Sequence, residues 1–480
     1  MDGTVLEGVP SAPSSLLGFV SLFVTKFASP SRPTLTQQPT CRHSSFEQRK
    51  QTRERLRLLG QSAFSAEEVQ QHNTPEDCWI VVDGKVHDVS GFDHPGGDVV
   101  FSYAGQDASE VFATMHKSQV VARKLLKAYC IGELVGANQA PLLKDFHAMK
   151  QSFAEQGLLD ANPIYYTRKC LELVGMVGTS LYLLFAYSSS LPALLASSLL
   201  MAIFIFQCGW ACHDFHHNQI FKRVFPNELV GAIILNIGMG GSTHWWKTKH
   251  NQHHATPNKM TENNQATDPD IDTVPLIAWS ENLMKQVQAS GRSIIIIQHI
   301  VMWPLLFVAY INWLYKSVGH LMYQPAISTK QRRIEIGAIA FHHVWLNACI
   351  FGALGFTWQA AAYWMIAHTI SGFLTSFIFV QSHNGMEIYT DDKDFVTAQL
   401  VSTRNIHPGL FMDWFCGGLN YQIEHHLIPT MPRHSFSRAR PRIMELCARH
   451  GLPYESCSLT ESTIKVYKTL AHVGHAAKSA

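Results

Sequence analysis

The sequence WWKTKHNQHH at residues 245–254 places three imidazoles at positions i, i+3 and i+4 of a short polar stretch. On an α-helix this spacing brings His250, His253 and His254 onto one face, with about 5–6 Å between neighbouring Cβ atoms. Neutral imidazole is a good ligand for iron, zinc and copper. The stretch therefore predicts a metal-binding helix.

Two further histidine motifs lie upstream and downstream of this helix. Residues 213–217 read HDFHH, and residues 422–426 read QIEHH, which repeats the i, i+3, i+4 spacing with a glutamine in the first position. One such motif alone could be an ordinary polar helix, but three clusters favour a metal site. About eight imidazoles exceed the four ligands that one zinc ion uses. Two metal ions fit better, and nitrogen-rich sites that face a membrane suit iron and dioxygen.

The composition indicates a membrane protein with water-soluble parts. Charged residues make up 15% of the 480 residues, against about 25% in a soluble chain. Residues 170–187, 191–212, 336–356 and 360–380 are apolar, and each segment is long enough to cross about 30 Å of hydrocarbon. The net charge of +2 and the absence of a basic stripe give no indication of nucleic-acid binding.

Two other apolar stretches are predicted not to cross the membrane. Residues 229–241 are too short. Residues 293–315 have lysines or arginines beyond both ends, which favours the cytosolic side for both. The links at 188–190 and 355–358 are uncharged and fit the lumenal side. We therefore expect four transmembrane helices in two hairpins, with every histidine motif on the cytosolic face.

Residues 64–135 predict a small haem-binding domain. The stretch WIVVDGKVHDV at residues 79–89 predicts a β-hairpin that turns at its Asp-Gly pair. HPGGD at residues 94–98 combines a turn proline with glycines that let the backbone approach a flat ligand. Two histidines from separate short helices could hold one haem iron on its two axial sides. His94 and His116 are therefore the predicted haem ligands.

With Trp79 and Phe92, this segment resembles cytochrome b5 over its whole length. Lys85 is the only Lys or Arg between residues 64 and 116, where acidic residues dominate. This surface could dock a basic, NADH-dependent cytochrome b5 reductase, or it could be an ordinary solvated face. A one-electron haem domain fits oxygen activation at two irons. The residues thus predict a membrane oxidase that acts on a C–H bond of a lipid-like substrate.

The whole arrangement resembles the membrane fatty acid desaturases, and among them the front-end group that is fused to an N-terminal cytochrome b5. The resemblance is closest to the Δ6 acyl-lipid desaturases of mosses and green algae, and it covers residues 64–467. The glutamine that opens QIEHH marks this group. Other matching stretches are WFCGGLNY at 414–421, MPRH at 431–434, DPDID at 268–272 and SHNGME at 382–387.

The resemblance implies a site of haem b and two non-haem iron ions, with O2 as co-substrate. Gln422 is implied as a catalytic residue that hydrogen-bonds near the metal without being a ligand. His216 departs from the family pattern, and its role as a ligand stays open. The implied iron ligands are His213, His217, His250, His253, His254, His383, His425 and His426.

The expected fold is an α-helical integral membrane protein with four transmembrane helices, a cytosolic histidine-rich cap and an N-terminal α+β cytochrome b5-like domain. The expected location is the endoplasmic reticulum membrane, with a plastid membrane as the alternative. The expected divisions are a weakly ordered tail (1–60), the haem domain (64–135), a linker (136–169), the desaturase domain (170–467) and a C-terminal tail (468–480).

The expected activity is Δ6-type front-end desaturation. A cis double bond would form between an existing double bond and the carboxyl end of a polyunsaturated acyl chain, carried by a membrane lipid or by CoA. No motif encodes the position of the new bond. The alternatives are a Δ5 or Δ8 front-end desaturase, a sphingolipid Δ8 desaturase, a cytochrome b5-fused fatty acyl hydroxylase, and a non-enzymatic electron carrier.

Overall fold

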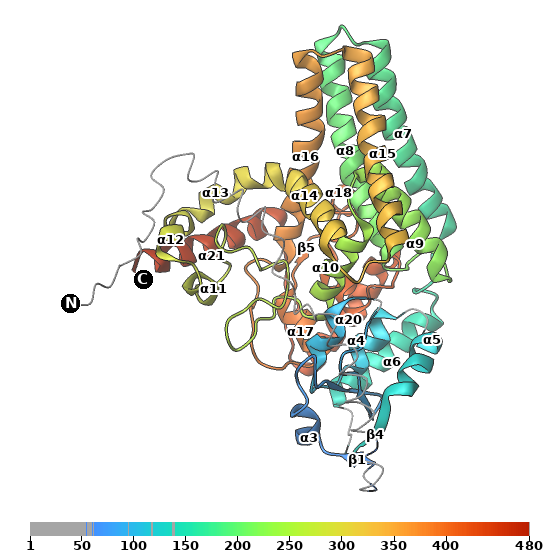
Figure 1. The fold of residues 1–480 in the computed structure, drawn as a ribbon, viewed down its shortest axis with the longest axis vertical. Coiled ribbons are helices and arrows are strands. Elements are labelled where there is room, and N and C mark those ends of the chain that lie inside the picture. Colours follow the sequence, from blue (N-terminus) through green and yellow to red (C-terminus); the bar gives the residue numbers. More distant parts are fainter. Residues whose placement is uncertain are drawn as a thin grey trace, which may run out of the picture.

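The computed structural model describes residues 62–94, 96–116, 119–136 and 140–479, together with Glu54 and Gly60. Nearly all of the predicted tail at residues 1–60 therefore lies outside the described residues. Figure 1 shows a tall helical bundle that rises from a broader base, and the N-terminal domain forms part of this base.

The N-terminal domain is built on a four-stranded sheet with the order β1-β4-β3-β2. The predicted hairpin is present, because β2 and β3 pair antiparallel and are joined by Asp83 and Gly84. Both residues have positive φ, 51° and 72°, as the favoured two-residue hairpin turn requires. The strands are β1 (Ala63–Phe64), β2 (Trp79–Val82), β3 (Lys85–Asp88) and β4 (Cys130–Leu134). The helices around the sheet are α3 (Ala66–Gln70), η1 (Asp98–Tyr103), α4 (Ser109–Met115), α5 (Gln119–Leu126) and η2 (Lys127–Tyr129).

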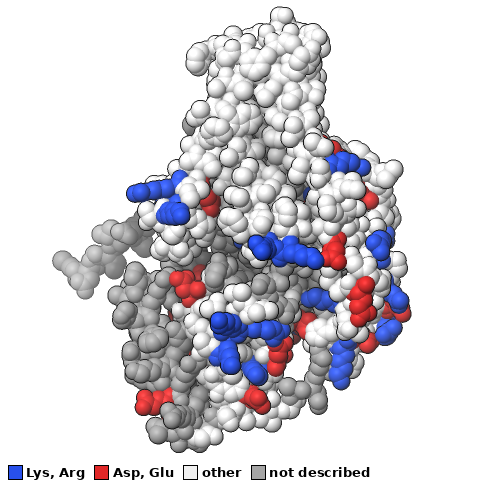
Figure 2. All heavy atoms as spheres, turned by 90° about the vertical axis from the view of Figure 1, so that its right-hand side faces the viewer, with Lys and Arg blue, Asp and Glu red and all other residues white. Residues whose placement is uncertain are grey.

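Among the described residues, four helices are long and apolar enough to cross a membrane, which confirms the predicted fold class. They are α7 (Pro163–Ala186), α8 (Leu191–His216), α15 (Thr329–Leu354) and α16 (Trp358–His383). The chain has no Asp, Glu, Lys or Arg between Glu172 and Asp214, or between Glu335 and Glu387. On the face that Figure 2 shows, the charged side chains accordingly gather around the base and leave the bundle uncharged. The α7–α8 and α15–α16 links lie together at the far end of the bundle (Figure 1).

Two sharply bent helix pairs lie beside the lower part of the bundle (Figure 1). Val224–Met239 meets α10 (Thr243–Ala255) at 111°, and α12 (Ala289–Ile296) meets Gln298–Tyr323 at 81°. The first pair bends at Gly240, which has φ +78° and where a Cβ would lie 2.6 Å from Cδ2 of His342. Bends of this size are compatible with a broken membrane span as well as with the interfacial or re-entrant segments that the sequence predicts. The parts of these pairs are α9 (Val224–Ala232), the π-helix η3 (Ile233–Met239), α13 (Gln298–Leu305), η4 (Leu306–Val308) and α14 (Ala309–Tyr323).

The rest of the chain completes the base. One hydrophobic core contains Ile80 and Val89 of the haem domain together with Phe146, Ile423 and Phe436. The N-terminal domain therefore packs directly against the C-terminal segments. The remaining elements are α6 (Pro141–Glu155), α11 (Glu281–Lys285), α17 (Phe395–Ser402), β5 (Asn405–Ile406), α18 (Leu410–Phe415), α19 (Gln422–Leu427), η5 (Arg433–Ser435), α20 (Phe436–His450), β6 (Ser456–Cys457) and α21 (Leu459–Ser479).

Candidate metal centre

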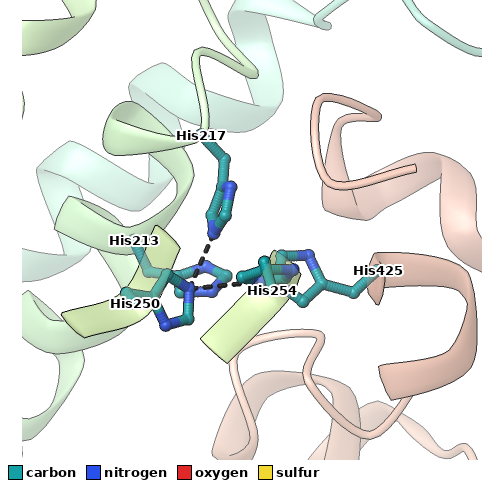
Figure 3. Close-up of side chains that lie close together, drawn as sticks. All are labelled: His213, His217, His250, His254 and His425. Carbon is teal, nitrogen blue, oxygen red and sulfur yellow. Dashed lines mark hydrogen bonds between the residues drawn. The ribbon is translucent and has the colours of Figure 1, made fainter. Parts of the chain in front are cut away.

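Five of the predicted histidines, from three separate elements, meet at the base of the bundle (Figure 3). One ligand nitrogen from each lies within 4.8 Å of every other. The end of α8 and the residue after it contribute two rings, α10 contributes two, and α19 contributes one. This five-histidine group consists of His213, His217, His250, His254 and His425.

The spacing of the nitrogens fits a single metal ion. The Nε2 atom of His250 lies 2.8 Å from that of His217 and 3.1 Å from that of His254. The Nε2 atoms of His254 and His425 are 3.0 Å apart. Ligands that are each about 2.1 Å from one ion and at right angles are about 3 Å apart. The Nε2 atom of His213 is also buried and has no hydrogen-bond partner among the described residues, so it is available to the same ion.

A three-histidine group lies beside the first. His253 of α10, His383 at the end of α16 and His426 of α19 bring ligand nitrogens within 4.8 Å of one another. In each ring, Nδ1–H donates to a buried acceptor, so Nε2 keeps its lone pair for a metal ion. The acceptors are Asp268 Oδ2 for His253 at 3.0 Å, the Ser402 carbonyl for His383 at 3.1 Å, and Gln399 Oε1 for His426 at 2.8 Å.

Gln422 reaches the three-histidine group from the first position of α19. Its side-chain amide nitrogen lies 2.8 Å from Nε2 of His383. Its Oε1 atom is buried and has no hydrogen-bond partner in the residues that the structure describes. The side chain therefore places its amide nitrogen beside a proposed iron ligand and has its Oε1 atom available at the site.

Burial keeps the clustered imidazoles other than His253 neutral, which is the form that binds a cation. In His253 burial also lowers the pKa, but the Asp268 carboxylate outweighs it and raises the pKa to about 9. Burial, reinforced by nearby rings, lowers the pKa of His425 and His426 well below the usual value. Burial also lowers the pKa of His217 to about 3, with a further contribution from Lys247. A proton therefore does not compete with a metal ion at these nitrogens near neutral pH.

Three supporting residues were not predicted from sequence. Asp268 is buried and also accepts a hydrogen bond from the Asn258 amide at 2.7 Å. It lies in the DPDID stretch, whose resemblance to the family could have pointed to it. Gln399 and the Ser402 carbonyl belong to α17 and lie in no motif, so only the folded structure reveals them.

His216, whose role the sequence leaves open, does not join either group. Its ring packs against Trp246 with centroids 5.4 Å apart. A Cβ on Gly231 would lie 2.7 Å from its Cε1 atom, so the ring fills the space above this glycine. His342 also lies elsewhere, with Nδ1 donating to the Ile237 carbonyl at 2.8 Å.

The N-terminal domain brings His94 and His116 to face each other. Their ring centroids are 5.8 Å apart, close to the roughly 6 Å expected for two imidazoles on opposite sides of one metal ion at about 2 Å each. Burial lowers the pKa of both rings, that of His94 to about 4. Nδ1–H of His116 donates to the Phe112 carbonyl at 3.0 Å, which leaves its Nε2 for an iron. His94 and His116 would therefore hold the iron of a haem, which would supply one-electron transfer.

A cavity of about 760 Å³ extends from the two histidine groups between the ends of α8 and α16 and the two bent helix pairs. Its volume lies within the range of about 300–1,000 Å³ that is typical of ligand sites. His213, His250, His253, His383 and Gln422 line one part of it. Its apolar walls include Trp210, Leu235, Met239, Met302, Leu306 and Phe379.

These features define a membrane oxidoreductase with a two-metal site and a haem domain. Residues 188–458 match the fatty acid desaturase family, and residues 65–135 match the cytochrome b5-like haem/steroid binding domain. The chain belongs to the fatty acid desaturase family. More particularly, it is a front-end desaturase fused to cytochrome b5, a multi-pass membrane protein with haem, a non-haem iron pair and O2 as co-substrate. The sequence-based predictions of family, fold class and cofactors are therefore confirmed.

Several characterised proteins are similar along most of their length. The acyl-lipid (9-3)-desaturase of Physcomitrium patens is 42% identical over 434 residues, which cover 89% of this chain and 81% of the relative. The Delta(5) fatty acid desaturase fat-4 of Caenorhabditis elegans is 30% identical, with 79% and 91% covered. Fatty acid desaturase 3 of Bos taurus is 29% identical, with 85% and 93% covered.

Proposed function

We propose that this front-end desaturase is of the Δ6 type and acts on polyunsaturated acyl chains carried by membrane lipids. The observation that carries this proposal is the apolar cavity, which opens directly onto both histidine groups. The similarity to a moss acyl-lipid desaturase supports a lipid-bound substrate. The similarity to a Delta(5) enzyme makes Δ5 specificity the second candidate.

The proposed ligands follow from the two groups and the haem domain. One iron would be held by the five-histidine group and the other by the three-histidine group, with Gln422 as a hydrogen-bonding neighbour. His94 and His116 would hold the haem iron. We retain the division into a tail (1–60), haem domain (64–135), linker (136–169), desaturase domain (170–467) and C-terminal tail (468–480) as part of this proposal.

The protein's own contribution to the reaction is to position the substrate, exclude water and hold the ligands. The iron pair supplies the oxidation of two adjacent methylene groups by O2, with electrons that arrive singly. The apolar cavity walls would hold the acyl chain beside the histidines and keep water away from the reacting carbons. Asp268, Gln399 and the Ser402 carbonyl fix the orientation of three imidazoles. The depth to which the chain enters the cavity would determine which carbons are oxidised.

The electron donor is proposed to be an NADH-dependent cytochrome b5 reductase at the cytosolic face of the endoplasmic reticulum. Exposed acidic side chains support docking of a basic partner. Asp93 and Asp98 flank the haem ligand His94 in sequence and are exposed. Other exposed acids of this domain are Glu67, Glu76 and Asp107.

Expression in yeast tests this function. Cells that carry the gene would be fed C18 and C20 polyunsaturated acids, and the new double bonds would be located by mass spectrometry of each lipid class. We expect a new double bond at Δ6, in phospholipid acyl chains before it is found in the CoA pool. His425→Ala should abolish the product, whereas the matched control His407→Ala should retain it, because His407 is an exposed histidine outside both groups.

Other products would identify the alternatives. A bond at Δ5 or Δ8 would change the assigned specificity, and a product confined to long-chain bases would indicate a sphingolipid desaturase. A hydroxylated chain would indicate a hydroxylase. A purified protein with one iron per haem group and no product would be an electron carrier, whereas a desaturase should contain three irons in total, one in haem and two outside it.

A further inference from the structure

The haem domain contacts the very helix that carries three of the clustered histidines. Nε2–H of Gln252 on α10 donates to Oγ of Ser102 at 2.8 Å. The hydroxyl of Tyr103 donates to the carbonyl of Ala255, the last residue of α10, at 2.9 Å. Ser102 and Tyr103 belong to η1, which closely follows the HPGGD segment.

The backbone around His94 also approaches α10 closely. A Cβ on Gly96 would lie 2.8 Å from Cε1 of His94 and 3.7 Å from Nδ2 of Asn251. A Cβ on Gly97 would lie 3.4 Å from Cγ2 of Thr248. These distances place the segment that carries a proposed haem ligand directly beside the helix.

The residues of α10 that contact the haem domain and the histidines of α10 lie on different stripes of the helix. Residues 248, 251, 252 and 255 are spaced by three, one and three, so they share one face of the helix. This docking stripe consists of Thr248, Asn251, Gln252 and Ala255. His250 and His254 point to the five-histidine group, and His253 points to the three-histidine group. The helix thus lies between the haem domain and both proposed iron sites.

We propose that the docking stripe is the surface across which electrons pass from the haem domain to the iron pair, and that Gln252 and Tyr103 are positioning residues for this transfer. In each transfer, one electron leaves ferrous haem, which becomes ferric, and reduces the iron pair. Two transfers and two protons, with two hydrogens from the substrate, reduce one O2 to two waters. The reductase re-reduces the haem. This inference rests on the proposed ligand roles of His94 and the α10 histidines.

Anaerobic flash reduction of the full-length protein tests the proposal without substrate or O2. Photoreduced flavin would reduce the haem, and the decay of the ferrous α-band would report electron transfer to the ferric iron pair. We expect Gln252→Ala and Tyr103→Phe each to slow this decay about fivefold, the effect of one lost hydrogen bond, and the double variant to be slower still. Haem content, iron content and the haem midpoint potential should stay at wild-type values.

Two further variants distinguish a loss of positioning at the docking stripe from a general disturbance of the haem domain. Gln252→Glu can still accept a hydrogen bond from the Ser102 hydroxyl and should restore most of the rate. Gln106→Ala removes a different contact of the haem domain, an exposed hydrogen bond to Asp392 of 3.0 Å, and should leave the rate unchanged. Wild-type decay in the double variant would overturn the proposed surface. If the wild-type protein itself shows no iron-dependent decay, the proposed ligand assignment fails, and this inference fails with it.

Discussion

At the scale of single residues, the two histidine groups differ in how their rings are held. In the three-histidine group every Nδ1–H has a named buried acceptor, whereas in the five-histidine group Nδ1 of His254 and of His425 has no hydrogen-bond partner within the described part of the chain. Rings that are oriented by an acceptor present Nε2 in a fixed direction before any metal arrives. The three-histidine group therefore compensates for its smaller number of imidazoles by a more rigid arrangement.

Iron content and activity together distinguish a Gln422 that hydrogen-bonds to an iron ligand from a Gln422 that binds iron directly. An amide is a weaker metal ligand than imidazole but readily donates or accepts a hydrogen bond. We expect Gln422→Ala to lose most desaturase activity while it keeps most of its non-haem iron, because its contact is to His383. His426→Ala should lose iron, since its Nε2 is one of three imidazole nitrogens in that group. Metal analysis and product formation on the same purified preparations measure both effects.

Equal loss of iron in the two variants would contradict this assignment and make Gln422 a direct ligand. The control is Gln151→Ala, a glutamine of α6 whose exposed side chain donates to Glu155 at 2.9 Å, which should retain both iron and activity.

At the scale of elements, α10 is held at its N-terminus by a buried carboxylate on a transmembrane helix. Ser242 is the N-cap, and its Oγ accepts a hydrogen bond from the amide of Trp245 at 3.1 Å. The same hydroxyl donates to Oε2 of Glu335 at 2.7 Å. Glu335 is 4% exposed and also accepts from the amide of His244 at 3.2 Å. The cap thereby fixes α10 relative to α15.

Ser242→Ala should therefore lower the free energy of unfolding by more than the loss of an ordinary N-cap does. Losing a serine N-cap typically costs about 1 kcal/mol, and leaving a buried carboxylate short of a donor adds about 1–3 kcal/mol. We expect a lower midpoint of thermal unfolding in detergent and a reduced iron content, because the histidines of α10 lose their fixed position. Ser328 is the N-cap of α15, and its Oγ accepts a hydrogen bond from the amide of Gln331 at 3.2 Å on the surface. Ser328→Ala should therefore show only the loss of stability that is typical of an N-cap.

An equal loss of stability in the two serine variants would show that the link to Glu335 contributes nothing.

The elements that the sequence could predict are those with a local signal. The spans were predictable because charge is absent over long stretches, and the β2–β3 hairpin because Asp-Gly favours one turn. The histidine spacing placed three rings on one face of α10. The contacts of Gln399 and of Gln252 could not be predicted, because their partners lie 27 and 150 residues away in sequence. The seven-residue π-helix Ile233–Met239 also has no recognised sequence signal.

At the scale of the whole molecule, polarity is segregated along the bundle axis. The far end of the bundle exposes aromatic side chains, with Phe356 at 96% and Trp358 at 65% exposure. Aromatic residues of this kind concentrate where a membrane meets water. The base carries the charged residues on the face seen in Figure 2, and it also contains the haem domain and both histidine groups. One membrane face should therefore contact all of the redox machinery.

This arrangement makes a prediction about topology that tags can test. Because lysine and arginine favour the cytosolic side, tags inserted after residue 135, at residue 262, at residue 325 and at the C-terminus should all be accessible to protease from the cytosol. Tags at Ser189 or Thr357, in the uncharged links at the far end of the bundle, should be protected until the membrane is opened by detergent.

The tag at residue 325 is decisive, because it follows the bent segment Gln298–Tyr323. Its protection from cytosolic protease would make that segment a true membrane span and would contradict the two-hairpin arrangement. Its digestion, together with retained desaturase activity in the tagged protein, would support a cytosolic site that receives its electrons and its acyl chain from the same face of the membrane.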